Sequence, residues 1–322
     1  MKNYMKNITE YVCKLRFEDI PSDVVMRAKL VVIDTIAAIA AGAQEEEIKK
    51  LSKSLNVTDG KGVSSVIGSG FKTEALKAAL LNGASGTFLE IDEGNQFGRG
   101  HPAVQMLPAV IAVAEEKKLS GKDLITALVA GYEIGTRIGI ASKLRMSMHP
   151  HGVWGTVAAA VGLGKLLDYD QAAMKELISV SASMTTATNR QTMLDGGTVR
   201  NIYSGMSSHN GLLAHYMIQS GFTGEKDGLN TVFSSVVSEE FNQEAMIKDL
   251  GNYFEIGRNY FKRYACCRYN HSALDATMEI TGSLPDGRLD PDAIEKIDVW
   301  TYSLAAQLCG QEPDNMLAAK FS

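Results

Sequence analysis

Long apolar stretches rich in small residues most strongly limit what this chain can fold into. Small side chains such as Ala158-Ala159-Ala160 allow helix axes to approach closely. The most apolar run, Val31 to Ala43, contains Asp34 and is far shorter than the ~20 residues of a membrane span. The stretches predicted to be helices are 21–43, 73–88, 103–118, 121–143, 156–167, 171–183 and 199–220. They indicate a helical bundle.

The sequence changes character after about Gly221. Aromatic residues alternate with polar ones from Tyr253 to Tyr264, and 271–282 has the pattern of a helix. Ile294 to Tyr302 alternates like a strand. We therefore predict a mainly α fold, in which a large helical-bundle domain (1–250) is followed by a partial, smaller α/β domain (251–322). With 322 residues, 45% of them hydrophobic, the chain can bury a substantial core.

Charge and cysteine spacing exclude several classes of function. The net charge of −5 and the lack of a basic stripe argue against nucleic acid as a partner. Charged residues interrupt Tyr11 to Asp19, so no apolar core of a signal peptide follows the first lysines, and we expect a cytoplasmic protein without membrane attachment. The four cysteines form no C-x-x-C pair, which is poor spacing for zinc or an iron–sulfur cluster. We expect no metal and no cofactor.

The first candidate for chemistry is Gly100-His101-Pro102, which opens a predicted helix and follows an acidic loop, Glu90 to Asn95. Free N–H groups at a helix N-terminus favour anions, and proline is tolerated in the first turn. A carboxylate-bearing substrate is one interpretation. The alternative is a capping histidine surrounded by solvated acids.

The second candidate is Met148-His149-Pro150-His151-Gly152, which also leads into a helix of small residues. Two histidines at i and i+2 can bind a metal, but a third ligand at a supportive spacing is missing. Proton transfer is a better hypothesis, because imidazole titrates near neutral pH. Ordinary loop histidines remain the alternative.

The third candidate runs from Tyr260 to His271 and places Lys262, Arg263 and Arg268 among aromatic residues. Such a cationic cluster can bind a polyanionic acid, and a desolvated lysine can serve as a base. A solvated strand is the alternative. No triad spacing supports Cys267 as a nucleophile. Arg200, before another helix, is a candidate anion clamp or simply a surface arginine.

These patches, in this order, resemble the MmgE/PrpD family, whose members include 2-methylcitrate dehydratase, cis-aconitate decarboxylase and iminodisuccinate epimerase. The resemblance covers nearly the whole chain. It rests on Asp34-Thr35-Ile36-Ala37, Asn82-Gly83 with the acidic loop, Gly100-His101-Pro102, Leu107-Pro108-Ala109, Gly131-Tyr132-Glu133, His149 to Thr156, Asn201 to Gly211, Gly221 to Gly224 and Lys262 to Asp275. It implies a homodimer without metal or organic cofactor, with its active site between a helical domain and a smaller α/β domain.

The resemblance also implies roles for individual residues. The family's acidic loop matches Glu90 and Asp92, its two active-site histidines match His101 and His149, and its later lysine matches Lys262. We predict His101, His149, Lys262 and Asp92 as catalytic residues. We predict that substrate is bound by Glu90, Arg200, Tyr203, Arg263 and Cys267. The implied reaction is that of a hydro-lyase, in which a proton next to a carboxylate is abstracted and a hydroxyl is eliminated. An epimerase or isomerase of a related dicarboxylate is one alternative, and a truncated, catalytically silent binding protein is another.

Departures from the family pattern bear on the reaction. Arg200 and Tyr203 replace the lysine and histidine of the K-x-x-H-x-G motif, Gly94 stands where the decarboxylase has threonine, and Cys267 where it has histidine. No tyrosine matches that enzyme's later site tyrosine, near Gln307, so decarboxylation of cis-aconitate is disfavoured. Family members also continue beyond Ser322. We expect an ending there to leave strands unpaired and apolar surface exposed unless a partner covers them.

Overall fold

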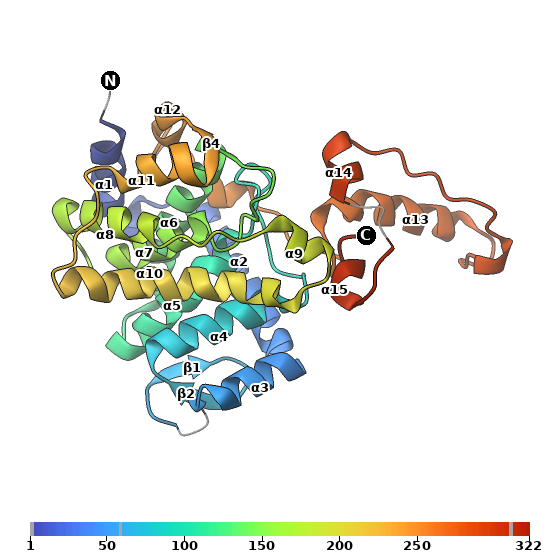
Figure 1. Ribbon diagram of the computed structural model, residues 1–322, viewed down its shortest axis with the longest axis horizontal. Coiled ribbons are helices and arrows are strands. Elements are labelled where there is room, and N and C mark those ends of the chain that lie inside the picture. Colours follow the sequence, from blue (N-terminus) through green and yellow to red (C-terminus); the bar gives the residue numbers. More distant parts are fainter. Residues whose placement is uncertain (1–2, 58–59, 309–311) are drawn as a thin grey trace.

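The computed structural model describes residues 3–57, 60–308 and 312–322, which form a mainly α fold as predicted (Figure 1). The α-helices are α1 (Tyr4–Lys14), α2 (Ser22–Gly42), α3 (Glu46–Ser54), α4 (Ala75–Phe88), α5 (Pro102–Lys117), α6 (Gly121–Ala141), α7 (Trp154–Leu166), α8 (Gln171–Ser183), α9 (Arg190–Leu194), α10 (Tyr203–Gln219), α11 (Gly228–Thr231), α12 (Gln243–Ile247), α13 (His271–Ser283), α14 (Ser303–Leu308) and α15 (Met316–Ala319). All the predicted helices are confirmed, whereas α1, α3 and the short helices α9, α11, α12, α14 and α15 were not predicted.

Short helical turns and strands connect these helices. The turns are η1 (Phe17–Asp19), η3 (Thr198–Ile202), η4 (Val232–Val236), η5 (Glu255–Arg258), η6 (Arg268–Asn270) and η7 (Pro291–Ala293). Strands β1 (Ser64–Val66) and β2 (Phe71–Thr73) pair antiparallel, as do β3 (Ser142–Leu144) and β4 (Ser238–Phe241). The second pair joins the end of α6 to the chain that leads toward η5.

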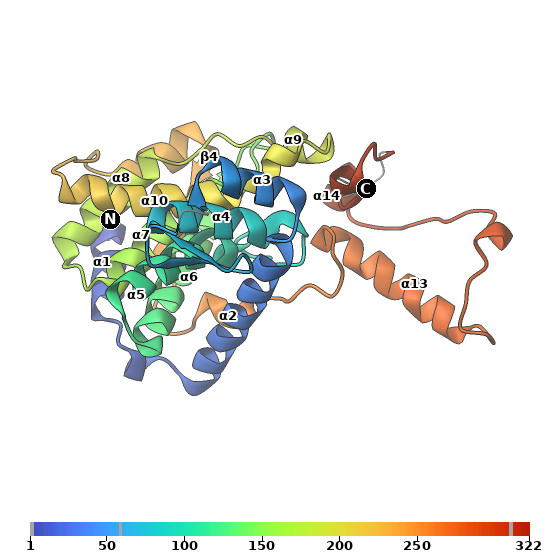
Figure 2. The ribbon, with the colours of Figure 1, turned by 90° about the horizontal axis from the view of Figure 1, so that it is seen from below.

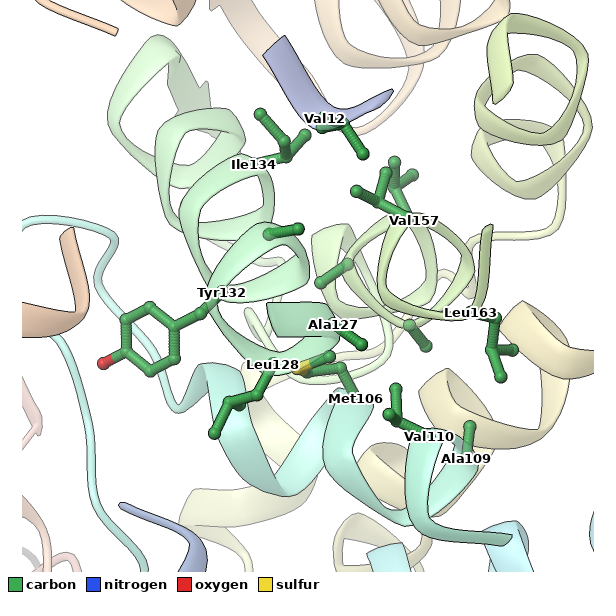
Figure 3. Packing of buried hydrophobic residues seen from close by; sticks show 14 of the residues in the cluster. Val12, Met106, Ala109, Val110, Ala127, Leu128, Tyr132, Ile134, Val157 and Leu163 are labelled. Carbon is green, nitrogen blue, oxygen red and sulfur yellow. The ribbon is translucent and has the colours of Figure 1, made fainter. Parts of the chain in front are cut away.

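The core lies where α4, α5, α6, α7 and α10 pack together. Small residues allow this: a Cβ added at Gly83 would lie 2.7 Å from the Cα of Gly205, so α4 and α10 meet backbone to backbone. Figure 3 shows apolar side chains such as Met106 and Leu128 interlocking between α5 and α6, while Tyr132 points away from them. The hydroxyl of Tyr132 reaches Glu93 in the loop after α4, which links the core to that loop.

Helix α6 is long and apolar enough to cross a membrane, yet 89% of its apolar window is buried inside the protein. Burial of that extent is what a core helix requires, because its apolar side chains already have protein neighbours. No other helix of the described residues meets the length and composition of a span. We therefore interpret α6 as part of the bundle core.

The segment that contains α13 extends away from the bundle, and both views show α13 standing apart from it, whereas the last residues return to contact α9 (Figures 1 and 2). The prediction of a strand from Ile294 to Tyr302 is wrong for the described structure, where this segment pairs with no strand. A strand needs a hydrogen-bonding partner, and Trp300 here is 96% exposed. The division into domains at residue 250 stays a prediction.

Candidate active site

The loop between α4 and α5 carries four of the ionisable side chains of the site. Helix α5 begins at Pro102, which suits the first helical position because it has no N–H to leave unpaired. His101 is the residue before it, yet its side chain does not cap the helix. Glu93 does so instead, because its Oε1 accepts the N–H of Ala103 at 3.0 Å. The imidazole of His101 is thereby left available for another role.

The orientation of His101 is set by this same loop. Its Nδ1 lies 2.8 Å from the carbonyl oxygen of Glu93 and 3.0 Å from Oδ2 of Asp92. Since a carbonyl oxygen only accepts, Nδ1 carries the proton. In the neutral ring Nε2 is then unprotonated, and it can accept a proton while the buried Asp92 carboxylate faces the other nitrogen.

A second loop positions His149 and His151 before α7. Thr188 holds it, because its Oγ1 donates to the carbonyl oxygens of both histidines, at 2.9 and 2.6 Å. Gly152 has φ +88°, and a Cβ there would lie 2.4 Å from the Oγ1 of Thr186. The Nδ1 of His149 accepts the N–H of His151 at 3.1 Å, so the neutral His149 ring carries its proton on Nε2. The two loops thus present opposite imidazole tautomers.

The three imidazoles form one cluster. The ring of His151 is 4.9 Å from that of His101 and 4.7 Å from that of His149, measured between centroids, so it lies between them. Ser204 lies 3.2 Å from the Nδ1 of His151, and Tyr203 stacks edge-on against His149 at 5.7 Å. Both residues come from the start of α10, which therefore closes one side of the cluster.

Two cations, from distant parts of the chain, bind one buried carboxylate. Arg200 and Lys262 both form ion pairs with Glu90, and the Nζ of Lys262 also donates to the Glu90 carbonyl oxygen at 3.0 Å. All three side chains are at most 2% exposed. Glu90 has φ +58°, a conformation that costs a non-glycine residue about 1–3 kcal/mol. Strain at a buried, doubly paired carboxylate is typical of a functional site.

The segment that carries Lys262 is fixed to the bundle at several points. Tyr260 and Gly94 exchange two backbone hydrogen bonds, at 3.0 and 2.8 Å. The N–H of Glu255 donates to the buried carboxylate of Glu133 on α6 at 2.6 Å, and Asn95 donates to the Glu255 carbonyl oxygen. These contacts bring Lys262, far away in the sequence, to the loop of Glu90.

Burial sets the protonation of several of these groups. It lowers the pKa of His149 and of His151 well below the usual value, and the nearby Arg200 adds to the shift, so both rings are neutral at pH 7. Burial raises the pKa of Glu93 to about 7. Burial opposes ionisation of Glu90 too, but Arg200 and Lys262 outweigh it and hold the pKa of that carboxyl below its usual range.

Comparison with known proteins identifies the family of this chain. The family model of the MmgE/PrpD N-terminal domain matches residues 6–242. The chain belongs to the MmgE/PrpD family. Cis-aconitate decarboxylase of Aspergillus terreus is 28% identical over 336 residues, covering 97% of this chain and 68% of that protein. The cis-aconitate decarboxylase-like protein oryM of Aspergillus oryzae is 27% identical, covering 94% of this chain and 66% of that protein. These similarities support an enzyme of the lyase type.

In this MmgE/PrpD chain the structure brings together most of the residues predicted from the sequence. They are Glu90, Asp92, His101, His149, Arg200, Tyr203 and Lys262. Arg263 is not among them, because its side chain is 75% exposed and faces Asp275. Cys267 is half-buried beside the apolar cluster of Met193, Leu317 and Phe321, with its N–H bonded to the Lys320 carbonyl oxygen. Arg263, which follows Lys262 in the sequence, therefore lies outside the site that contains Lys262.

Sequence reasoning missed two groups of the site. His151 was considered for a metal pair and for proton transfer but was not chosen as a site residue, although its ring lies beside the other two imidazoles. Glu93 was named only as a member of the acidic loop, although it is 1% exposed and bonded to Ala103 and Tyr132. The sequence Gly100-His101-Pro102 was a usable signal, since a proline of this kind marks the start of a helix. The free N–H groups in the first turn of a helix are commonly capped by a side chain. Within the described residues, no group of three or more His, Cys, Asp or Glu is arranged to hold a metal ion.

Proposed function

We propose that this protein is a hydro-lyase of the 2-methylcitrate dehydratase type, which removes a proton next to a carboxylate of a small polycarboxylate and expels a neighbouring hydroxyl. One observation carries the proposal: the imidazoles of His101, His151 and His149 adjoin one another beside a buried ion pair formed by Arg200 and Lys262 with Glu90. Carbon acids of this kind need a base together with cations that stabilise the enediolate.

His101 is the general base in this proposal. Its Nδ1–H is held by the Glu93 carbonyl oxygen and faces the Asp92 carboxylate, so Nε2 is the nitrogen that can take the proton. Asp92 then stabilises the imidazolium that forms, in the way that a carboxylate supports the histidine of a hydrolase triad. The partly exposed side chain, at 13%, leaves the ring accessible to a ligand.

His149 binds the departing hydroxyl. Because its Nδ1 is occupied by the N–H of His151, the neutral ring presents Nε2–H, which donates a hydrogen bond to the hydroxyl oxygen. The proton that His101 has taken from carbon then moves to that oxygen as the carbon–oxygen bond breaks, and water departs. Electrons from the broken carbon–hydrogen bond form the new double bond. Both imidazoles are neutral again when the reaction is complete.

Arg200 and Lys262 stabilise the negative charge that develops on the substrate carboxylate. Glu90 offsets only one of their two positive charges. A buried positive charge without a partner is unfavourable, so the site favours a negatively charged ligand. The ligand's carboxylate is the group whose charge grows in the transition state.

A second candidate is decarboxylation, which both of the relatives named above favour, since each is called a cis-aconitate decarboxylase or its like. Decarboxylation also passes through a carbanion next to a carboxylate and needs the same cations. Gly94 and Cys267 depart from the decarboxylase pattern described above. Epimerisation would differ in the last step alone, where the proton returns to the opposite face.

A substrate panel tests the proposal. Purified protein is incubated with 2-methylcitrate, citrate, cis-aconitate and aspartate-derived dicarboxylates, and the products are followed by proton NMR. Formation of a double bond from a hydroxy acid supports the dehydratase. Release of carbon dioxide from cis-aconitate supports the decarboxylase, and a change of configuration without loss of mass supports an epimerase. Binding without turnover would favour a catalytically silent protein and contradict the proposal.

We further propose a cytoplasmic homodimer, as the family resemblance implies. The outward face of α2 supports self-association, because Met26, Leu30 and Ile33 are 56%, 43% and 63% exposed and lie on one side of the helix. Light scattering on the purified protein should give twice the chain mass. Replacing Ile33 with glutamate should shift that mass toward the monomer.

A further inference from the structure

The segment 315–322 crosses beside the proposed site. The backbone N–H of Cys267 donates to the carbonyl oxygen of Lys320 at 2.8 Å, and Asn315 donates to the Gly196 carbonyl oxygen at 3.3 Å. The ring of Phe321 lies 5.4 Å from the guanidinium carbon of Arg200. Helix α15 packs against α9, as Figure 1 shows. Contacts with Cys267, Gly196 and α9 therefore hold this segment next to Arg200, which pairs with Glu90.

Lys320 lies within the electric field of that ion pair. Its side chain is half-buried, and its Nζ donates to the carbonyl oxygen of Phe88 at 3.2 Å. Burial lowers the pKa of Lys320, the positive charges of Arg200 and Lys262 lower it further, and Glu90 acts in the opposite direction. Phe88 is the last residue of α4, two positions before Glu90. Lys320 is thus a third cation beside one carboxylate loop.

The charges of this region do not balance. Arg200 and Lys262 pair directly with the carboxylate of Glu90. Lys320 forms no ion pair among the described residues, and Glu90 and Glu45 act on its charge at longer range. An ammonium has three donors, and the hydrogen bond to Phe88 uses one of them. Two donors and an uncompensated positive charge remain, and a second carboxylate of a ligand can satisfy both.

We propose that Lys320 is a specificity-determining residue that binds a second carboxylate of the substrate, in addition to the one bound by Arg200 and Lys262. This inference rests on the proposed function, because it assigns a further contact of the same site. In the free protein the Lys320 ammonium rests on the C-terminal carbonyl group of α4. In the complex its remaining donors bind the ligand, so the protein prefers dicarboxylates to monocarboxylates of the same length.

The competing explanation is purely structural. A lysine near a helix C-terminus stabilises the last carbonyl groups, and Lys320 does so at α4. Lys165 is a matched control for this role. The Nζ of Lys165 donates to the carbonyl oxygen of Cys13 at 3.1 Å. Lys165 is also half-buried, and burial lowers its pKa as it does for Lys320. It lies in the last turn of α7 and contacts the end of α1, and Glu90 is not among the charges that act on it.

The test measures the binding of two probes of equal shape, glutarate and its half-amide glutaramate, by titration calorimetry on the full chain. Wild-type protein should bind glutarate more tightly. Lys320→Met should weaken glutarate binding about tenfold or more, the usual effect of losing a hydrogen bond between charged groups, and leave glutaramate within about twofold. Lys165→Met should leave the preference for glutarate intact, and Lys320→Arg should restore most of it.

Thermal unfolding separates folding from recognition. If Lys320→Met only lowers the melting temperature, as Lys165→Met is expected to do, and keeps the preference for glutarate, Lys320 is a helix cap and the inference is overturned. If Lys320→Met does not fold, Lys320→Arg and Lys320→Gln are compared, and equal preferences would overturn it likewise. A wild-type protein that binds neither probe contradicts the proposed function itself, which is a different result.

Discussion

The Nδ1 atom of His101 lies 3.0 Å from the Oδ2 atom of Asp92, whose side chain is buried. Both residues belong to the loop that leads into α5. A carboxylate here supports the charge of the imidazolium that forms during catalysis. Asp92→Asn keeps the shape of the side chain and removes that charge. We expect turnover to fall about 100-fold, with little change in substrate binding. Steady-state kinetics measures this, and an unchanged kcat would contradict the role of Asp92.

Removing the charge of Glu90 should destabilise the protein. Glu90→Gln leaves Arg200 and Lys262 buried without a counter-charge, which typically costs about 3–5 kcal/mol of unfolding free energy. Urea unfolding at pH 7 measures the loss. The control is Glu10→Gln, which breaks an exposed ion pair with Lys14 and should change stability very little. Equal effects of the two substitutions would show that the buried pair is not important for the fold.

The dependence of stability on pH should reveal the buried Glu93. Burial raises its pKa from 4.5 to about 7, so the folded state binds the proton more tightly than the unfolded state. The stability that this group contributes is present below pH 4.5 and is lost as the pH rises to 7. We compare the unfolding free energy of Glu93→Gln with that of wild type at each pH. The difference should favour the variant more at pH 8 than at pH 4.5, because only the wild type loses stability as Glu93 ionises. A difference between the two proteins that is the same at both pH values would exclude this shift.

Gly94 should not tolerate a side chain. A Cβ there would lie 2.4 Å from the hydroxyl oxygen of Tyr260, so Gly94→Ala must displace the segment that carries Lys262. Overpacking of this kind typically costs about 1–3 kcal/mol. Gly121→Ala is the matched control, since its Cβ would meet no atom within 4 Å. Thermal unfolding and turnover should both fall for the first variant only, and a fully active Gly94→Ala would show that the segment is not closely fitted.

The sequence could predict the bundle because its helices are long and rich in small residues. Gly83 and Gly205, for example, are needed where two helix backbones meet. It could also predict most of the site, since Gly100-His101-Pro102 and His149-Pro150-His151 are local patterns with a chemical meaning. The resemblance to the family placed Lys262 and Glu90 in the same site, but it did not predict the ion pair between them.

The failures have physical causes. Ile294 to Tyr302 alternates like a strand, but alternation does not supply a partner strand, and none pairs with it in the described residues. Arg263 follows Lys262 directly, but neighbouring residues of an extended segment point in opposite directions, and only Lys262 faces Glu90. His151 depends on the orientation of a loop held by Thr188, a residue far away in the sequence.

The central claim is that His101 takes a carbon-bound proton from a carboxylic acid, and isotope exchange tests it most directly. Wild-type protein, His101→Asn and the control His209→Asn are incubated in deuterated water with the polycarboxylate that the panel identifies, and loss of the proton signal next to the carboxylate is followed by NMR. We predict that wild type and His209→Asn exchange or eliminate that proton, while His101→Asn is at least about 100-fold slower yet remains folded. Exchange at the wild-type rate in His101→Asn would contradict the account.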